Sequence, residues 1–228
     1  MVDFAYLYNT VGFIGIYETM KKFGYTYTDQ FDNTYYKPEA YTFGKRIFEE
    51  MRKAMDDFIA ENNCEYQINC EQIPGETAAA KLMKKDKFFY PEANIYDLPL
   101  YGNQFIPLGI QTTLQERVKI ASAFDSYCNG GSIAHINIEG PFLNFDQAWD
   151  MVNYIADQGL TYFAFNTKIQ ACEKNHAFFG KKCPICGGDV YTEYTRIVGF
   201  YTSTKSWSKA RRDEYKMREW ADVSKGNN

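Results

Sequence analysis

Apolar residues recur along the chain at spacings that predict several helices. Over residues 39–62 they return every three to four positions, which is the spacing of one face of an amphipathic helix. The same spacing predicts helices over 113–128 and 145–159. Residues 4–24 are apolar and aromatic, and we interpret them as a buried helix that ends near Gly24.

Other segments alternate between apolar and polar residues, as the two faces of a strand do. This alternation predicts strands at 66–70, 105–108, 132–138 and 160–166. Parallel strands need long crossover connections, which are usually helical, so helices between strands favour parallel pairing. The sequence therefore predicts an α/β protein.

One predicted strand runs directly into a turn and a helix, over residues 71–82. The turn and the start of the helix read Pro74-Gly75-Glu76-Thr77-Ala78. The free N–H groups and the dipole at the N-terminus of a helix attract anions, so this turn is a candidate anion site. The alternative is an ordinary N-cap, in which the side chain of Thr77 or Glu76 satisfies those N–H groups.

The cysteines suggest a metal site. The chain has six cysteines, and a chain of this length with this apolar content does not need disulfides for stability. Cys183 and Cys186 are separated by two residues, and Cys172 and His176 precede them. Three thiolates and one imidazole are a ligand set that binds structural zinc in a tetrahedron. A redox-active dithiol and a chance pair are the alternatives for Cys183 and Cys186.

Gly199 stands alone among bulky residues in the run TRIVGFY (residues 195–201). No Asn, Asp, Pro or second Gly accompanies it, so we expect it not to lie in a turn. Such a glycine usually marks a β-bulge or a close backbone approach. Glycine also has two Cα hydrogens and no side chain. Loss of one hydrogen leaves a planar radical that the amide nitrogen and the carbonyl both delocalise.

Composition and charge narrow the class of protein. The 228 residues are 45% hydrophobic and carry a net charge of −4, which favours a packed core and gives no general case for binding nucleic acid. Residues 181–228 hold 10 basic and 6 acidic residues, a local charge of +4. We interpret 208–220 as a solvated helix, with an anionic partner as the alternative. With no signal peptide or membrane span, we expect a soluble, cytoplasmic protein.

Five stretches together resemble one family. They are the cysteine pair, the glycine run, the tail WSKARRDE, the turn PGETAA and the phrase GGSIAH. They are similar to the C-terminal portion of the anaerobic (class III) ribonucleoside-triphosphate reductases, which are glycyl radical enzymes. The resemblance implies half of a ten-stranded α/β barrel over 1–167, followed by a zinc-binding and glycyl radical segment over 168–228.

The resemblance also implies roles for individual residues. Gly199 would carry the stored radical. The residues of the PGETAA turn would hold the substrate phosphates, and a structural zinc would keep the glycine loop in place. The phosphate-binding residues are Gly75, Glu76, Thr77 and Ala78, and the zinc ligands are Cys172, His176, Cys183 and Cys186. Members of the family commonly have two Cys-x-x-Cys pairs, and this chain departs from that pattern at His176. Nothing in the sequence assigns a role in proton transfer to Glu76 or His135.

Family members are far longer than this chain. Their thiyl-forming cysteine and their nucleotide-sensing, ATP-binding domain lie upstream of the region that this chain resembles. We expect Cys64, Cys70 and Cys128 to pack as small hydrophobic residues rather than to replace that cysteine. The resemblance therefore implies that this chain alone does not reduce nucleotides.

The resemblance implies several partners. They are an N-terminal reductase portion on another chain, a radical-SAM activase with an iron–sulfur cluster and S-adenosylmethionine, a ribonucleoside triphosphate, and a second copy of the assembled enzyme. No membrane and no direct nucleic-acid contact are expected. The product would be deoxyribonucleotides for DNA replication under anaerobic conditions.

Three other functions remain open. The chain could be a zinc-containing binding module whose basic tail contacts nucleic acid or protein, or an inactive remnant of a reductase. A different glycyl radical enzyme, acting on a small metabolite, is the third. Enzymes of that third kind lack a cysteine pair just before the glycine, so Cys183 and Cys186 argue against it.

Overall fold

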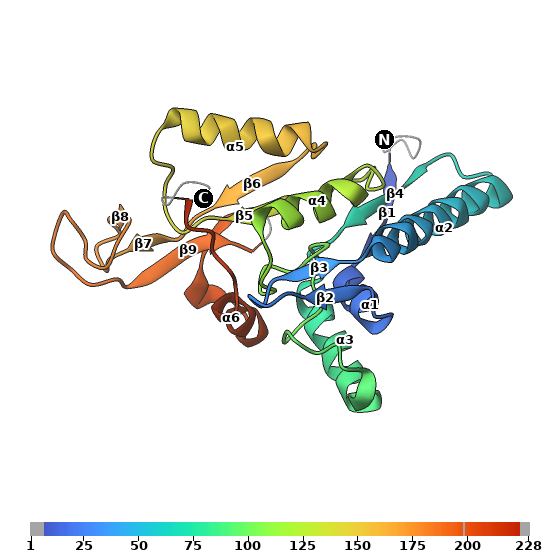
Figure 1. The fold of residues 1–228 in the computed structure, drawn as a ribbon, viewed down its shortest axis with the longest axis horizontal. Helices are drawn as coiled ribbons and strands as arrows, with labels where there is room; N and C mark the ends of the chain where they lie inside the picture. Colours follow the sequence, from blue (N-terminus) through green and yellow to red (C-terminus); the bar gives the residue numbers. More distant parts are fainter. Residues whose placement is uncertain (1–6, 198, 224–228) are drawn as a thin grey trace.

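The computed structural model describes residues 7–197 and 199–223, and four of its strands pair in parallel. Three of them, β4 (Gln67–Gln72), β5 (Ala134–Asn137) and β6 (Phe163–Asn166), were predicted from the sequence, whereas β1 (Tyr8–Phe13) was not. β1 pairs with β4 and β5 with β6, both in parallel. A parallel bridge between Glu71 and Gly131 joins β4 to the segment that enters β5. The four strands thus follow one another in space in the order β1, β4, β5, β6 (Figure 1).

Helices make the crossovers between these strands, as the sequence predicted. The helices are α1 (Ile16–Lys22), α2 (Pro38–Asn62), α3 (Glu76–Phe89), α4 (Leu114–Asp125) and α5 (Phe145–Asp157). A hairpin of β2 (Thr26–Thr28) and β3 (Thr34–Tyr36) precedes α2, and the short 3₁₀ helix η2 (Pro91–Ala93) follows α3. No helix among the described residues is both long enough and apolar enough to cross a membrane.

An aromatic cluster forms the centre of the main core. It consists of four buried phenylalanines: Phe13 of β1, Phe48 of α2, Phe105 in the loop before α4, and Phe124 of α4. The centroids of neighbouring rings lie 5.0–6.0 Å apart. Cys70 and Cys128 belong to the same core, as expected of small hydrophobic residues. This core fixes α2 and α4 against the parallel strands.

Two of the predicted elements are wrong. Part of the helix predicted over 4–24 is strand β1, which pairs with β4 along its whole length, and the helix is confined to α1. Residues 1–6 of that prediction lie outside the described residues. Gly15, at φ +84°, separates strand from helix, and Gly24, at φ +72°, lies just beyond the helix end as predicted.

The strand predicted at 105–108 is the second error, because this segment is a buried loop. Its backbone carbonyls find a side-chain partner instead of a neighbouring strand. The Arg117 guanidinium donates to the carbonyls of Ile106, Pro107 and Ile110 at 2.9–3.2 Å. Burial lowers the pKa of Arg117 to about 10, so the side chain remains a cation at neutral pH.

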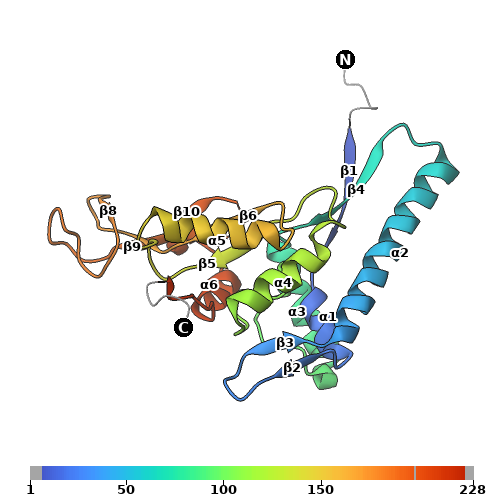
Figure 2. The same ribbon diagram turned by 45° about the horizontal axis from the view of Figure 1, so that its top comes forward.

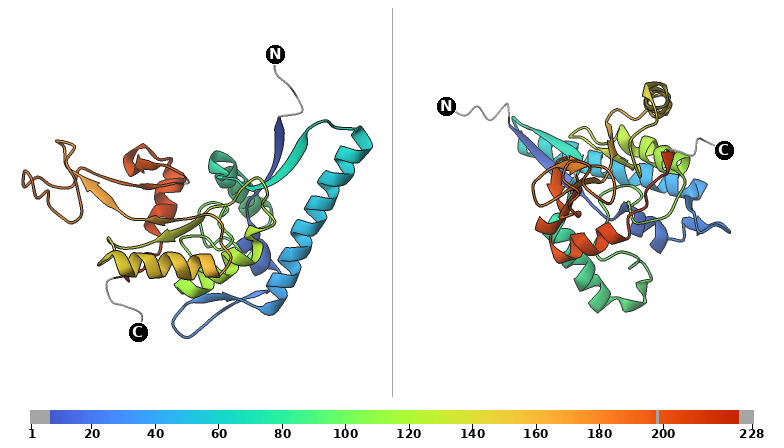
Figure 3. Two further views of the ribbon diagram at one scale, coloured as in Figure 1. Left: turned by 90° about the horizontal axis from the view of Figure 1, so that it is seen from above. Right: turned by 90° about the vertical axis from the view of Figure 1, so that its left-hand side faces the viewer.

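A second sheet follows the parallel strands. Its four antiparallel strands are β7 (Ile169–Ala171), β8 (Ala177–Phe178), β9 (Thr192–Arg196) and β10 (Tyr201–Ser203), in the order β10-β9-β7-β8. The 3₁₀ helix η3 (Thr204–Ser206) and helix α6 (Lys209–Lys216) complete the chain's regular structure. β7 and β8 lie at the end of the molecule opposite α2 (Figures 2 and 3).

We expect the carboxyl group of Glu18 to make the stability of the fold depend on pH. The side chain is buried, and Oε1 accepts a hydrogen bond from the Gly102 N–H at 3.1 Å, whereas Oε2 has no hydrogen-bond partner among the described residues. Burial raises the pKa of Glu18 to about 7. Because the folded pKa is above the unfolded one, its contribution to stability is complete below about pH 4.5 and is lost as pH rises through 7.

Replacing Glu18 by glutamine removes this titration. Between pH 4.5 and pH 8, we expect the difference in free energy of unfolding between Glu18→Gln and wild type to shift by about 3 kcal/mol in favour of the variant. Urea unfolding of both proteins at the two pH values measures the shift. An unchanged difference would mean that Glu18 titrates normally in the folded chain.

Candidate metal centre and glycine loop

Four potential metal ligands come together beside β7 and β8. One ligand atom from each of Cys172, His176, Cys183 and Cys186 lies within 4.8 Å of all the others. Cys172 Sγ is 3.7 Å from Cys186 Sγ, and Cys183 Sγ is 3.5 Å from His176 Nδ1. The corresponding edges of a tetrahedron around zinc are about 3.8 Å for two sulfurs and about 3.6 Å for sulfur and nitrogen. The four residues therefore fit a tetrahedral zinc ion.

The backbone around Cys183 explains why the ligands converge. The Gly187 N–H donates to the Cys183 carbonyl, and the Cys183 N–H donates to the Gly188 carbonyl, both at 2.9 Å. This tight loop requires Gly187 at φ +69°, a conformation that favours glycine. With Phe178, the three cysteines form a small core separate from the main one. A bound ion would thus tie together a part of the chain that buries little apolar surface.

Gly199 lies in the connection between β9 and β10. Residues 197–200 join these antiparallel strands, and Tyr201 pairs with Arg196 across the hairpin. The expectation that Gly199 is not in a turn is therefore wrong. The expected β-bulge or close approach is also absent: φ of Gly199 is not in the left-handed region, and a Cβ built on it meets no atom within 4 Å. Neither strain nor space among the described residues requires glycine at this position.

The glycine loop is open in this chain. Gly199 is exposed, and the side chain of the following Phe200 is 83% exposed. Val198 lies outside the described residues. The metal cluster and the loop lie at opposite ends of β9. Thr192, at the start of β9, pairs with Ala171, which directly precedes the metal ligand Cys172. Arg196, at the end of β9, leads into the glycine loop. One sheet thus connects the metal cluster to the glycine.

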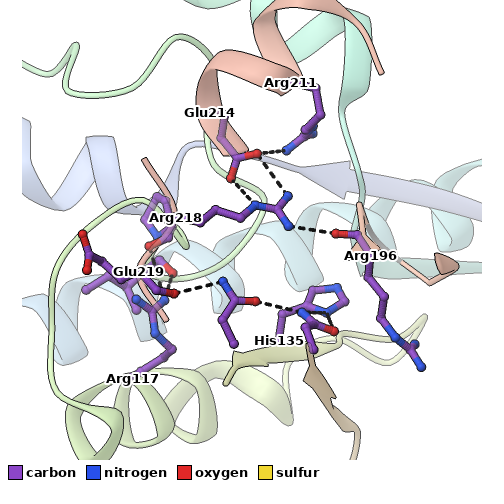
Figure 4. A network of polar contacts seen from close by, with 11 residues as sticks. Arg117, His135, Arg196, Arg211, Glu214, Arg218 and Glu219 are labelled. Atoms are coloured by element: carbon purple, nitrogen blue, oxygen red, sulfur yellow. Dashed lines mark hydrogen bonds and ion pairs between the residues drawn. The ribbon is translucent and has the colours of Figure 1, made fainter. Parts of the chain in front are cut away.

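The basic tail is tied into the protein rather than simply solvated. The Glu214 carboxylate of α6 accepts hydrogen bonds from Arg218 at 2.9 and 3.0 Å and forms an ion pair with Arg211 at 3.3 Å. All three side chains are buried. Arg218 also donates to the carbonyl of Arg196 at 2.8 Å (Figure 4). The solvated-helix interpretation of 208–220 is therefore wrong for the inner face of α6, which fastens the end of β9.

Replacing Glu214 by glutamine leaves buried cations without their carboxylate. We expect Glu214→Gln to reduce the free energy of unfolding by about 3–5 kcal/mol, the usual cost of removing one partner of a buried ion pair. Asp213→Asn, on the exposed face of the same helix, is the matched control and should change little. Thermal and urea unfolding give the comparison; equal effects of the two variants would refute the structural role of the buried pair.

The predicted anion turn has the expected form. β4 leads through the turn into α3, whose N-cap is Gly75 at φ +65°. The N-cap position itself has no side-chain hydrogen bond, and among the described side chains Thr77 does not provide the ordinary N-cap. A Cβ at Gly75 would lie 2.9 Å from Ile14 Cγ2, so the turn fits closely onto the segment between β1 and α1. Thr77 and Ala78 are exposed, and the first N–H groups of a helix have no intrahelical partner.

Sequence reasoning missed a chain of buried polar side chains that leads from β5 to the tail. His135 Nδ1 contacts the side-chain amide of Asn166, and Asn166 Nδ2 donates a hydrogen bond to Asn137 Oδ1 at 3.1 Å. Asn137 Nδ2 in turn donates to the Glu219 carbonyl at 3.2 Å (Figure 4). Burial lowers the pKa of His135 to about 4, so the imidazole is neutral at pH 7. The signal was available: an Asn lies at the end of each of two neighbouring predicted strands.

Comparisons with known proteins agree on one family. The family model described as anaerobic ribonucleoside-triphosphate reductase matches residues 3–220. A solved anaerobic ribonucleotide reductase is 36% identical with a TM-score of 0.87, and the match covers 94% of this chain and 34% of that one. The Thermotoga maritima anaerobic ribonucleotide reductase with glycerol in its active site is 36% identical with a TM-score of 0.82, covering 91% and 33%.

A further Thermotoga maritima structure, in complex with dATP and CTP, is 36% identical with a TM-score of 0.80 and the same coverage of 91% and 33%. This chain therefore spans about a third of the length of the solved structures that it matches. A search of curated protein sequences found no match.

Proposed function

The chain belongs to the anaerobic ribonucleoside-triphosphate reductase family, and we propose that it is the glycyl-radical-bearing C-terminal part of such a reductase. The observation that carries this proposal is the state of Gly199. It is exposed, unstrained and uncrowded, so the fold of the described chain gives no reason for a glycine there. Radical chemistry at Cα gives that reason, because the captodative radical needs a planar centre without a side chain.

The reaction at Gly199 is a hydrogen-atom transfer. The Cα–H bond would break homolytically, the hydrogen atom would pass to the radical-SAM activase, and the unpaired electron would stay on Cα. In the assembled enzyme this radical takes a hydrogen atom from the thiyl-forming cysteine of the missing portion. The thiyl radical then takes the 3′ hydrogen of the ribose.

The missing portion also completes the fold. We propose that β1, β4, β5 and β6 belong to one half of a ten-stranded barrel and that further strands continue it beside β1. The exposure of β1 supports this: Tyr8 is 65% and Val11 40% exposed. An isolated half-barrel has open edges, so we expect poor solubility without the missing portion. The same portion would cover Phe200 and shield the radical from oxygen.

The N-terminus of α3 is the proposed phosphate site. The uncapped helix start and Gly75 let backbone N–H groups of Glu76, Thr77 and Ala78 approach the phosphates of a ribonucleoside triphosphate. A Cβ at 75 would lie 2.9 Å from Ile14 Cγ2, so the packing of this turn depends on glycine.

The metal cluster has a structural role in this proposal. Cys172, His176, Cys183 and Cys186 would hold a zinc ion, which supplies a crosslink and no catalytic water, because all four ligand positions come from protein. The separate small core around it supports the division into residues 1–167 and 168–228. A cytoplasmic location, a homodimer of the assembled enzyme and a role in deoxyribonucleotide synthesis complete the proposal.

Reconstitution tests the proposed function. This chain, the N-terminal portion that holds the thiyl cysteine, the activase, S-adenosylmethionine, a reductant and a ribonucleoside triphosphate are combined without oxygen. We expect deoxyribonucleotide only when all are present. No product with an activase proven on another reductase would favour an inactive remnant.

A zinc-containing binding module is the alternative function. The tail argues against it, because Arg211 and Arg218 are buried and engaged with Glu214. Salt-sensitive binding of nucleic acid by the whole chain would favour this alternative over the reductase.

A further inference from the structure

The carbonyl oxygen of Gly199 has a cationic partner. Arg196 Nη1 donates a hydrogen bond to it at 2.9 Å, across the connection between β9 and β10. A hydrogen bond from a guanidinium is charge-assisted and stronger than a neutral one. The carbonyl of a glycyl radical is its electron-withdrawing side, so this contact falls on one of the two groups that delocalise the unpaired electron.

Arg196 is itself fixed from several directions. Its own backbone carbonyl accepts the hydrogen bond from Arg218 at 2.8 Å, and Arg218 is held by Glu214 in the buried ion pair. The Arg196 guanidinium lies over the Tyr201 ring, 5.1 Å from its centroid. The Tyr201 hydroxyl in turn accepts a hydrogen bond from the Thr167 N–H at 3.2 Å. The guanidinium is therefore held in place rather than free to leave the loop.

We propose that Arg196 is a positioning residue that tunes the glycyl radical, by drawing spin density from Cα of Gly199 toward its carbonyl oxygen. A cation at the oxygen makes the carbonyl a better electron acceptor. The radical is then more stable, and less of the unpaired electron remains on Cα. Helix α6 contributes through Glu214, which holds Arg218, and Arg218 in turn holds the backbone of Arg196. This inference rests on the proposed function, since it assumes a radical at Gly199.

Electron paramagnetic resonance of the assembled enzyme separates tuning from simple support of the loop. The splitting by the remaining α hydrogen is proportional to the spin density on Cα. In Arg196→Gln we expect a wider splitting and a roughly tenfold lower radical yield, the effect of losing one charge-assisted hydrogen bond. Arg196→Lys keeps a cation and should restore part of both. Arg46→Gln, an exposed arginine on α2, should match wild type.

A measurement on the wild-type protein covers the case in which Arg196→Gln fails to fold. Incorporation of ¹⁵N-arginine should give the radical a ¹⁵N coupling in electron–nuclear double resonance. Absence of that coupling, or a wild-type splitting in folded Arg196→Gln, would overturn the inference while the proposed function stands. No radical in wild type would instead contradict the proposed function and this inference with it.

Discussion

Replacement of Gly199 by alanine is expected to abolish nucleotide reduction by the assembled enzyme and to leave the fold intact. The Cβ of alanine meets no atom within 4 Å, and the backbone is outside the left-handed region. The free energy of unfolding should therefore change by less than about 1 kcal/mol. The chemistry is lost because a methyl group crowds the planar radical and shields the remaining Cα–H from abstraction.

Exposure to oxygen after activation gives a direct readout of this prediction. Oxygen attacks a glycyl radical and breaks the chain at that residue, so wild type should yield two fragments whose masses place the break at Gly199. Gly199→Ala should stay whole. Gly140→Ala is the matched control, since Gly140 also has open space around it and no positive φ. Cleavage of Gly199→Ala, or its full activity, would remove Gly199 from the mechanism.

Loss of the metal is expected to have the second largest effect. The sheet β7–β10 is short, and among the described residues the core around Cys183 consists of Phe178 and the three cysteines of the cluster. Small domains of this kind take much of their folding free energy from zinc. In Cys183→Ala we expect bound zinc to fall from about one ion per chain to near none. The four-stranded sheet should then lose protection from hydrogen exchange while α2 and α4 keep theirs.

Elemental analysis and hydrogen exchange by mass spectrometry measure these two changes. Cys64→Ala, which alters a cysteine outside the cluster, should retain both zinc and protection. The radical yield should fall in Cys183→Ala together with the sheet, because β9 carries the glycine loop. Zinc retained at the wild-type level in Cys183→Ala would show that the four ligands do not form the metal site.

Local sequence patterns predicted most of the first part of the fold. The long helix α2 and the strand-turn-helix of β4 and α3 follow from periodicity and from the Pro-Gly turn. β1 could not be distinguished from a helix in this way, since its residues are nearly all exposed and show no alternation. Its strand conformation depends on pairing with β4, which lies more than fifty residues away in the sequence.

The candidate site, like the fold, could be predicted only in part. The spacing of the four metal ligands in the sequence was enough to predict that they lie together, because the short segment between them limits how far apart their sulfur and nitrogen atoms can be. The burial of the charged tail could not be foreseen, because charge runs are usually solvated. Glu214 and Arg218 can be buried because Arg218 forms hydrogen bonds both to Glu214 and to the carbonyl of Arg196. The second of these contacts joins segments that are distant in the sequence.

Anaerobic electron paramagnetic resonance of the wild-type chain, combined with the N-terminal portion, the activase, S-adenosylmethionine and a reductant, shows directly whether Gly199 carries the radical. We predict a doublet from one α hydrogen. It should collapse to a single line when the chain contains deuterated glycine and vanish in Gly199→Ala. A signal that persists in Gly199→Ala, or no signal with an activase active on another reductase, would contradict the assignment of the radical to Gly199.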